Sequence, residues 1–324
     1  MVRANLPKLV TIFGGSGFVG RHLVRVLAER GYRVRVAVRR PDLAGHLRPL
    51  GDVGQIQLVQ ANLRYQDSVN AAARGADVIV NLVGILQQSG RQRFDAVQEF
   101  GARTVAAAAR HANARLVHMS AIGADVNSTS RYGSTKGKGE KAVTEIVKNA
   151  IIVRPSIVFG PEDDFFNRFG AMSRLSPFLP LIGGGKTKFQ PVYVGDVAEA
   201  MALAVDGKLA EGKIYELGGP EIVSFRECLE RMLREIGRER MMINLPFFAA
   251  RAVGALVGWL PGAPITTDQV EMLKSDNVVS DLAISQKRTL QGIGIEPTPM
   301  AAVLPSYLVQ YRPQGQFTKL EHDA

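Results

Sequence analysis

The chain has 324 residues, of which 46% are hydrophobic and 22% charged, with 33 Gly, 16 Pro and one Cys. This composition excludes a disordered chain and a disulfide framework, and the length suits one large domain or two. The formal net charge is +10, but residues 1–40 hold nine Lys/Arg and one acid, Glu29. A nucleic-acid-binding protein spreads its basic residues over a face, so we expect no nucleic-acid partner.

The location of the protein is predicted from segments that the sequence lacks. No run of about 18 apolar residues free of charge occurs, so we expect no transmembrane segment. A strand pattern begins by about Lys8, which leaves no room for a removable leader. The single Cys228 suits a reducing compartment. We therefore expect a cytoplasmic protein without a leader peptide.

The first half of the chain alternates short apolar runs with helical patterns, notably over Phe94–His111 and Tyr132–Lys148. This alternation predicts an α/β fold, a Rossmann-type doubly wound parallel sheet whose strand carboxyl ends lie along one ligand-binding edge. The expected strands are Leu9–Phe13, Tyr32–Val38, Ile56–Gln60, Asp77–Val83, Ala114–Ser120 and Ala150–Pro155.

After Gly160 the alternation weakens, and we expect a small, mostly helical C-terminal lobe. Ser176–Phe189 is rich in Pro and Gly and is predicted to be a loop, and Lys213–Gly219 to be one more strand. Helices are expected at Ser224–Gly237, near Leu245–Leu260 and at Thr267–Ser275. The predicted domains are a dinucleotide-binding domain over 1–165, continued by about 187–219, a helical lobe over 166–186 and 220–312, and a loose tail over 313–324.

The strongest local motif is FGGSGFVG, directly after the first strand and at the start of a helix. Glycines in this context let the backbone turn sharply and approach a pyrophosphate, and the helix N-terminus offers free N–H groups to it. A glycine-rich turn without a ligand is the alternative. The residues expected to contact a dinucleotide here are Gly14, Ser16, Gly17, Phe18, Val19 and Gly20.

The end of the second strand selects between NAD and NADP in such folds. An acid there binds the ribose 2′-hydroxyl, whereas an Arg accommodates a 2′-phosphate. Here the strand is followed by Arg39 and Arg40, with no acid until Asp42. We therefore expect NADP(H) in preference to NAD(H), although both arginines also fit a solvated strand end. Further contacts are expected at the next strand ends, from Asn62, Leu63, Leu82, Val83 and Gly84.

Ser120, Tyr132 and Lys136 form the candidate catalytic group. Tyr132 and Lys136 are four residues apart on one predicted helix, so the ammonium can lie beside the phenol and lower its pKa. Ser120 ends the fifth strand, where its hydroxyl can bond a substrate carbonyl or alcohol. The spacing therefore predicts a proton-transfer site beside the cofactor.

With these motifs the sequence resembles the short-chain dehydrogenase/reductase superfamily, in its extended or atypical branch. The resemblance includes RPSIVFGP from Arg154, with Pro155 and Ile157 expected beside the nicotinamide, and VYVGDVA, in which Asp196 is expected to cap a helix. It implies that Tyr132 is the acid/base, that Lys136 holds the nicotinamide ribose, and that Ser120 positions the substrate.

A narrower resemblance rests on GGSGFVGRHLV, SRYGSTKGKGE, RPSIVFGPEDDFFNRF and KFQPVYVGDVA. These runs are similar to the NADPH-binding accessory subunits of respiratory complex I and their bacterial relatives. The resemblance implies a structural or assembly role with complex I partners, peripheral on the inner face of a bacterial cytoplasmic membrane. The alternative is an active NADPH-dependent reductase, or a nucleotide-sugar-type epimerase or dehydratase, acting on a small carbonyl or alcohol.

Met241–Ala263 is the most apolar region, but Pro246 and Pro261 bracket only about fourteen residues of it, with Arg251 among them, which is too short to span a bilayer. It is expected to be a helix over the core of the second lobe or a partner-facing helix, the latter favoured by Phe247, Phe248 and Trp259. The five His show no metal-ligand spacing, so no metal is expected. Cys228 is predicted to be a small core residue, and the acids at 162–164 to begin a helix.

Overall fold

The computed structural model describes residues 7–90, 92–258 and 265–317. The chain divides into two compact units. The first unit comprises Met1–Arg154 and Val197–Glu216, and the second comprises Pro155–Asp196 and Leu217–Ala324. The domain limits expected from the sequence stay a prediction, and Trp259 lies outside the described residues.

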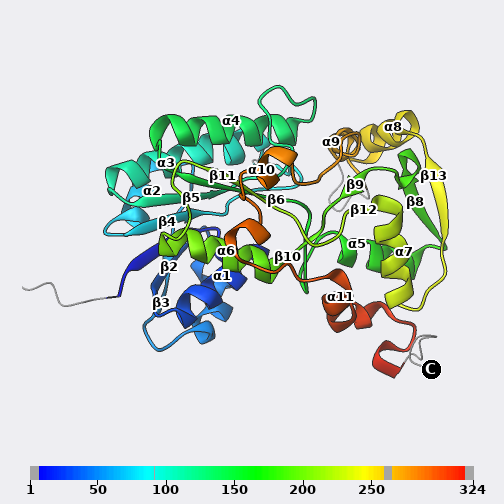
Figure 1. The fold of residues 1–324 in the computed structure, drawn as a ribbon, viewed down its shortest axis with the longest axis horizontal. Coiled ribbons are helices and arrows are strands. Elements are labelled where there is room, and N and C mark those ends of the chain that lie inside the picture. The colour runs from blue at the N-terminus through cyan, green and yellow to red at the C-terminus, as the bar shows by residue number, and fades with distance from the viewer. Residues whose placement is uncertain (1–6, 91, 259–264, 318–324) are drawn as a thin grey trace, which may run out of the picture. The chain divides into compact units, whose positions relative to one another are not determined.

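The first unit is built on a seven-stranded sheet in the order β11-β6-β5-β4-β1-β2-β3. Its paired strands run parallel, which confirms the predicted doubly wound sheet. Figure 1 shows α2, α3 and α4 on one face of this sheet and α1 and α6 on the other. The strands are β1 Leu9–Phe13, β2 Arg33–Val38, β3 Ile56–Gln60, β4 Val78–Asn81, β5 Arg115–Met119, β6 Ile151–Pro155 and β11 Ile214–Leu217. The helices are α1 Phe18–Glu29, α2 Gln66–Ala73, α3 Phe100–His111, α4 Arg131–Ile146 and α6 Val194–Asp206.

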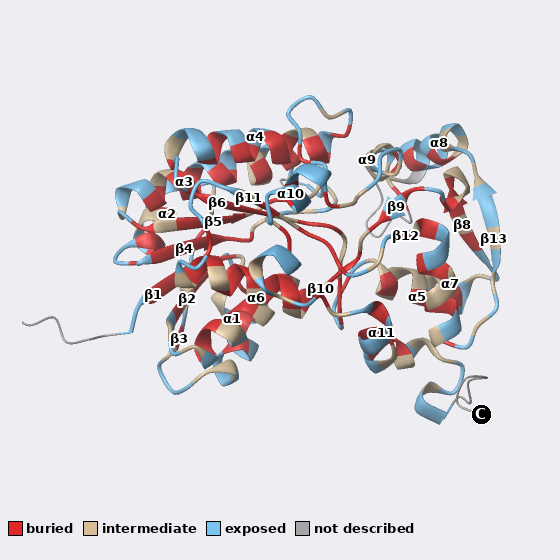
Figure 2. Ribbon diagram, in the orientation of Figure 1, coloured by how far each residue is buried: buried red, intermediate tan, exposed pale blue. Residues whose placement is uncertain are grey.

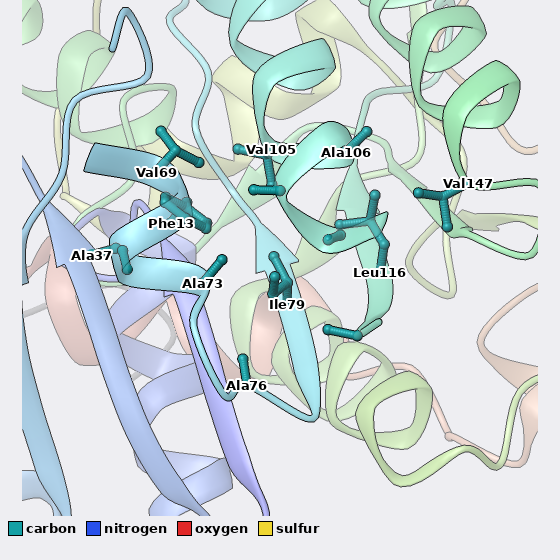
Figure 3. Close-up of a cluster of buried hydrophobic side chains, with 14 of the residues drawn as sticks. Phe13, Ala37, Val69, Ala73, Ala76, Ile79, Val105, Ala106, Leu116 and Val147 are labelled. Atoms are coloured by element: carbon teal, nitrogen blue, oxygen red, sulfur yellow. The ribbon is translucent and has the colours of Figure 1, made fainter. Parts of the chain in front are cut away.

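One part of the core of this unit lies between the sheet and the helices α2, α3 and α4. Phe13, Ile79 and Leu116 come from three neighbouring strands, and Val105 and Ala106 come from α3 (Figure 3). The alanines of α3 are short, so the helix lies close against the strands. This packing holds the carboxyl ends of the strands in fixed positions.

The predicted helix Phe94–His111 is interrupted by a wider turn. A π-helical turn spans Asp95–Glu99, and α3 begins only at Phe100. Gln98 in this turn is buried, donates to the carbonyl of Ile85 and accepts from the hydroxyl of Thr135. A buried polar side chain that bonds two neighbouring segments accounts for the local departure from the α-helix.

The second unit combines helices with three two-stranded sheets, which pair β10 with β7, β12 with β9 and β13 with β8. The strands are β7 Val158–Phe159, β8 Phe178–Ile182, β9 Lys188–Phe189, β10 Val192–Tyr193, β12 Val223–Ser224 and β13 Met241–Leu245. The helices are α5 Phe166–Leu175, α7 Phe225–Glu235, α8 Phe247–Val257, α9 Thr267–Met272, α10 Asp281–Ser285 and α11 Met300–Leu308.

The prediction of a loop over Ser176–Phe189 is wrong. The segment contains strands β8 and β9, joined across a 3-10 turn over Gly183–Gly185. Within the described part of the chain β8 pairs only with β13, and a strand with one bonded neighbour tolerates the missing N–H of Pro180. Leu179 and Leu181 are fully buried, so the segment contributes to the core of the unit.

Two buried acids, Asp163 and Asp196, form hydrogen bonds with α11 and with the segment just before it. Asp163 accepts from the backbone N–H groups of Phe166 and Asn167, which confirms a helix start at the acidic segment, and from the hydroxyl of Tyr307. The prediction that Asp196 caps a helix is wrong. It lies inside α6 and accepts from the N–H and hydroxyl of Thr298.

Candidate dinucleotide-binding site

The turn between β1 and α1 is made entirely by backbone. Gly14 has a φ of 83°, and its N–H donates to the carbonyl of Ala37 at 3.2 Å. A Cβ on Gly14 would lie 3.2 Å from the backbone nitrogen of Val83, and a Cβ on Gly20 only 2.5 Å from the carbonyl oxygen of Gly14. The glycines therefore let β1, α1 and the segment after β4 approach one another without intervening side chains.

The N-terminus of α1 opens at this turn. Gly17 is its N-cap and provides no side-chain hydrogen bond, and the first turn of the helix contains no acid. The first N–H groups of a helix have no intrahelical acceptor, and the helix dipole favours an anion there. The turn and the helix together thus provide the backbone donors that a pyrophosphate needs.

The end of β2 offers no free carboxylate. Arg39 and Arg40 are both exposed, and Arg40 binds Asp42 through two guanidinium nitrogens, the shorter contact being 2.7 Å. The Arg40 hydrogen bond lowers the pKa of the Asp42 carboxyl. The first acid after the strand is therefore already neutralised by a cation.

Two other arginines of the basic N-terminal region hold the backbone. Arg33 donates to the carbonyl of Pro7, and Arg35 donates to the carbonyls of Ala72 and Arg74 at 2.8 Å each. Part of the local positive charge thus fixes the start of the sheet and the end of α2.

β4 pairs with β1 in the sheet, and β3 lies on the other side of β1, beyond β2. The side-chain oxygen of Asn62 accepts from the N–H of Arg64 and closes a turn, and Leu63 packs against the core. The N–H of Leu82 donates to the carbonyl of Phe13 at 2.9 Å. A Cβ on Gly84 would lie 3.2 Å from Nζ of Lys136, so the missing side chain leaves room for the ammonium.

Ser120, Tyr132 and Lys136 are all buried at the end of β5 and in the first turns of α4. Ser120 is 2% exposed, and its Oγ has no hydrogen-bond partner within the described part of the chain. Nζ of Lys136 lies 5.9 Å from the centre of the Tyr132 ring. A buried hydroxyl without a partner is costly, which is the condition expected of a group that bonds a ligand.

Lys136 is a buried cation. It is 4% exposed, and Nζ donates to the carbonyl of Met119 at 3.3 Å. Burial lowers its pKa to about 8, while the carboxylate of Glu140 acts in the opposite direction. The ammonium is therefore the main form at pH 7, but a negative or polar ligand would relieve its desolvation.

A buried His–Asn pair lies beside the lysine and was not predicted from the sequence. The side-chain oxygen of Asn81 accepts from the N–H of Val83, so its amide nitrogen faces Nδ1 of His118 at 3.1 Å. His118 must then accept at Nδ1 and carry its proton on Nε2. Burial, and next the charge of Lys136, lower the pKa of His118 to about 3, so the ring is neutral.

A buried ion pair that was not predicted from the sequence, Glu140 with Arg154, lies one helical turn beyond Lys136. Glu140 is buried and forms a bidentate pair with Arg154, at 2.8 and 2.6 Å. Arg154 also lies 3.6 Å from Glu216 of β11. The four-residue spacing from Lys136 to Glu140 is the signal that points to this carboxylate.

Three further predicted cofactor residues, Ser16, Phe18 and Val19, lie in the glycine turn and the first turn of α1, with Val19 buried, whereas Pro155 and Ile157 belong to the second unit. Pro155 is the buried last residue of β6, and Ile157 packs against an apolar cluster that includes Leu181 and Phe225. Their expected contact with the nicotinamide stays a prediction, as do the roles of the other site residues.

With this geometry in place, comparison with known proteins identifies the family. Residues 10–218 match the model of the NAD dependent epimerase/dehydratase family. The chain belongs to this family, which confirms the predicted extended short-chain dehydrogenase/reductase.

Individual relatives agree with the narrower resemblance. The chain is 35% identical over 320 residues to mitochondrial NADH dehydrogenase (ubiquinone) 1 alpha subcomplex subunit 9 of Arabidopsis thaliana, covering 95% of this chain and 79% of that protein. It is 31% identical over 256 residues to a ceramide reductase of Caulobacter vibrioides, covering 77% of each. The crystal structure of an NADPH-dependent quinone oxidoreductase of Escherichia coli in complex with NADPH has the same fold, with a TM-score of 0.72, 20% identity and coverage of 93% and 99%.

The residues present fit the dinucleotide that this family uses. The glycine turn has no room for a Cβ, the α1 N-terminus has no side-chain cap, and the Ser120 hydroxyl has no partner among the described residues. These three features lie in one unit, at the carboxyl ends of its strands. No helix in the described part of the chain is long and apolar enough to cross a membrane.

Proposed function

We propose that this chain is an NADP(H)-binding subunit that supports the structure or assembly of respiratory complex I. The observation that carries the proposal is the likeness to mitochondrial NADH dehydrogenase subunits along almost the whole chain, 95% of it in the Arabidopsis comparison. The likeness extends beyond the dinucleotide-binding part and includes the second unit. A shared cofactor alone would not require the second unit to be similar. We place the protein at the inner face of the cytoplasmic membrane, beside its partner subunits.

The preference for NADP(H) rests on the end of β2. The first acid, Asp42, is bound by Arg40, and Arg39 is exposed beside it. A planar guanidinium suits a 2′-phosphate, whereas a ribose 2′-hydroxyl needs a free carboxylate at this position. Gly14, Gly17 and the first turn of α1 are the groups proposed to hold the pyrophosphate.

Affinity purification from native membranes tests the assembly role. Tagged protein is recovered after mild detergent extraction, and the co-purifying subunits are identified by mass spectrometry. We expect subunits of the NADH:quinone oxidoreductase at near-stoichiometric amounts. Recovery of the chain alone, together with normal complex assembly in a deletion strain, would contradict the role.

The second candidate is an active reductase or epimerase, which the intact Ser120, Tyr132 and Lys136 favour. When bound, the nicotinamide supplies or accepts a hydride. Lys136 holds a positive charge near the phenol, Tyr132 transfers the proton at its hydroxyl, and the Ser120 hydroxyl bonds the reacting oxygen. The likeness to a ceramide reductase is consistent with this chemistry.

The two candidates are separated by turnover. NADPH oxidation is followed with a panel of small and lipid-like carbonyls, for the wild type and for Tyr132→Phe. The subunit role predicts no steady oxidation above the uncatalysed rate for either protein. Sustained turnover that falls at least about a hundredfold in Tyr132→Phe would establish the enzyme.

A further inference from the structure

Large apolar side chains are exposed mainly on the second unit. Among the described residues eighteen are strongly exposed, and twelve of these belong to this unit although it is the smaller of the two. Single exposed hydrophobic residues are ordinary on any protein, so the number matters only if some of them are neighbours.

Four of them are neighbours at the end of α5 and on the sheet of β8 and β13. Leu175 ends α5 and is 90% exposed. Met241 is 68% exposed, pairs with Phe178 in the register of the two strands, and donates its N–H to the carbonyl of Pro177. Ile243 is exposed two residues further along β13, on the same face as Met241, and Figure 2 colours most of this strand as exposed.

Three arginines lie directly beside these side chains. Arg240 donates to the carbonyl of Ser173 at 2.7 Å, which places it at the end of α5 next to Arg174. Arg238 donates to the carbonyl of Tyr311, and its pKa is lowered by burial and then by the charges of Arg240 and Arg174. Like charges gathered this closely repel one another, so an anionic surface placed against them would be stabilising.

We propose that this basic and apolar surface, formed by Leu175, Phe178, Met241 and Ile243 with Arg174, Arg238 and Arg240, docks on an anionic lipid bilayer. The apolar side chains enter the boundary between headgroups and acyl chains, and the guanidinium groups pair with lipid phosphates. Exposed apolar side chains directly beside clustered arginines are the combination that anionic lipid headgroups and the acyl boundary bind together.

The apolar exposure continues along the chain into α8. Pro246 joins β13 to this helix, on which Phe248 is 79% exposed and Leu256 is also exposed. Arg251 is the charged residue of the helix and lies 3.7 Å from Glu271. The helix thus lengthens the surface with further aromatic and aliphatic groups of the kind that enter a membrane interface.

Vesicle flotation tests the proposal without reference to cofactor binding. The full chain is floated with vesicles of phosphatidylcholine alone and with vesicles containing about a third phosphatidylglycerol, at low and high salt. We expect binding to the anionic vesicles, weakened by salt, and at least about tenfold weaker for Leu175→Asp. Arg174→Gln is expected to weaken binding about fivefold, roughly the 1 kcal/mol of one basic residue.

Val53→Asp is the matched control, because Val53 is a fully exposed aliphatic residue of the first unit that lies before β3, at the opposite end of the strand from the proposed nucleotide site. It should float as the wild type does, and all three variants should keep wild-type affinity for NADPH. Flotation that is unchanged in Leu175→Asp would overturn the proposal. So would retention on native membranes without flotation on either lipid, since that result identifies a protein partner. Loss of NADPH binding would instead count against the function proposed for the first unit.

Discussion

Polar side chains usually lie at the surface, but in the first unit several of them are buried at the candidate site. Ser120, Lys136 and His118 are all buried: His118 and Ser120 lie at the end of β5, and Lys136 of α4 bonds the carbonyl of Met119 in that strand. In the second unit the buried acids Asp163 and Asp196 have hydrogen-bond partners, and the departure is that apolar side chains such as Leu175 and Met241 are turned outward. Each kind of departure costs free energy in the isolated chain, and each is relieved by a different class of ligand.

The difference assigns separate tasks to the two units. A buried hydroxyl without a partner and a desolvated ammonium suit a polar ligand that enters the first unit. Exposed aliphatic and aromatic groups beside clustered arginines suit an extended surface that covers part of the second. Variants that affect one unit should therefore leave the ligand of the other unaffected.

The largest effect is expected from Gly20→Ala. The new Cβ would meet the backbone of Gly14 and Gly15 at 2.5 and 2.6 Å, so the turn must separate from α1. We expect the free energy of unfolding in urea to fall by about 3 kcal/mol, and NADPH affinity to fall by at least about tenfold.

Gly45→Ala is the control for this change, because a Cβ on Gly45 would meet no neighbouring side chain or backbone segment within 4 Å. It should keep both the stability and the affinity of the wild type. Equal behaviour of the two variants would show that the glycine turn does not hold the cofactor. Flotation on vesicles should not distinguish the folded variants.

Lys136→Met is expected to stabilise the first unit while weakening its ligand binding. The pKa of Lys136 is about 8 in the folded chain and 10.5 in the unfolded chain, so burying the charge costs stability at pH 7. Removing the buried charge should raise the free energy of unfolding by about 2 kcal/mol. This figure already subtracts about 1 kcal/mol for the lost hydrogen bond to the carbonyl of Met119.

The pH dependence checks the sign of this effect. Between pH 8 and 10.5 the unfolded chain binds more protons than the folded one, so wild-type stability should gain from this group as pH rises. Lys136→Met should lack that gain, and its NADPH affinity should no longer weaken above pH 8. A less stable Lys136→Met at pH 7 would contradict the account.

His118 should make the first unit sensitive to acid. Its pKa is about 3 when folded and 6.5 when unfolded, so the unfolded chain takes up a proton first as pH falls. Wild-type stability, measured by urea titration, should therefore drop by about 2 kcal/mol between pH 7 and pH 5 from this group. His118→Asn should lose that part of the pH dependence, whereas His111→Asn, at an exposed helix end, should retain it.

The smallest effect is expected in the second unit, from Tyr307→Phe. The Tyr307 hydroxyl donates to Asp163 at 2.5 Å, but Asp163 also accepts from three backbone N–H groups. Its removal should lower the free energy of unfolding by about 1 kcal/mol and leave NADPH affinity unchanged. Weaker NADPH binding in this variant would break the separation between the two units.

Much of the first unit was predictable because its strands and helices alternate with a clear period. β1 and β3 have the predicted limits, and the glycine turn falls between β1 and α1 as expected. The second unit was less predictable. Its strands are short and pair with segments distant in sequence, as β8 does with β13. β8 also contains a proline, so its sequence alone looks like that of a loop.

The candidate site shows the same limit at the level of single residues. Tyr132 and Lys136 lie on one helix, so their spacing was sufficient to group them. Asn81 and His118 come from neighbouring strands, and only their register places the ring against the amide. Asp is a residue type that often caps helices, but the carboxylate of Asp196 bonds Thr298, about a hundred residues further along the chain, which the sequence does not reveal.

The central claim is that the first unit binds NADP(H), and parallel titrations of NADPH and NADH, followed by nicotinamide fluorescence, test it most directly. The account predicts saturable binding of one NADPH per chain, tighter than that of NADH and weakened in Lys136→Met. Tighter binding of NADH, or no saturable binding of either nucleotide, would contradict it.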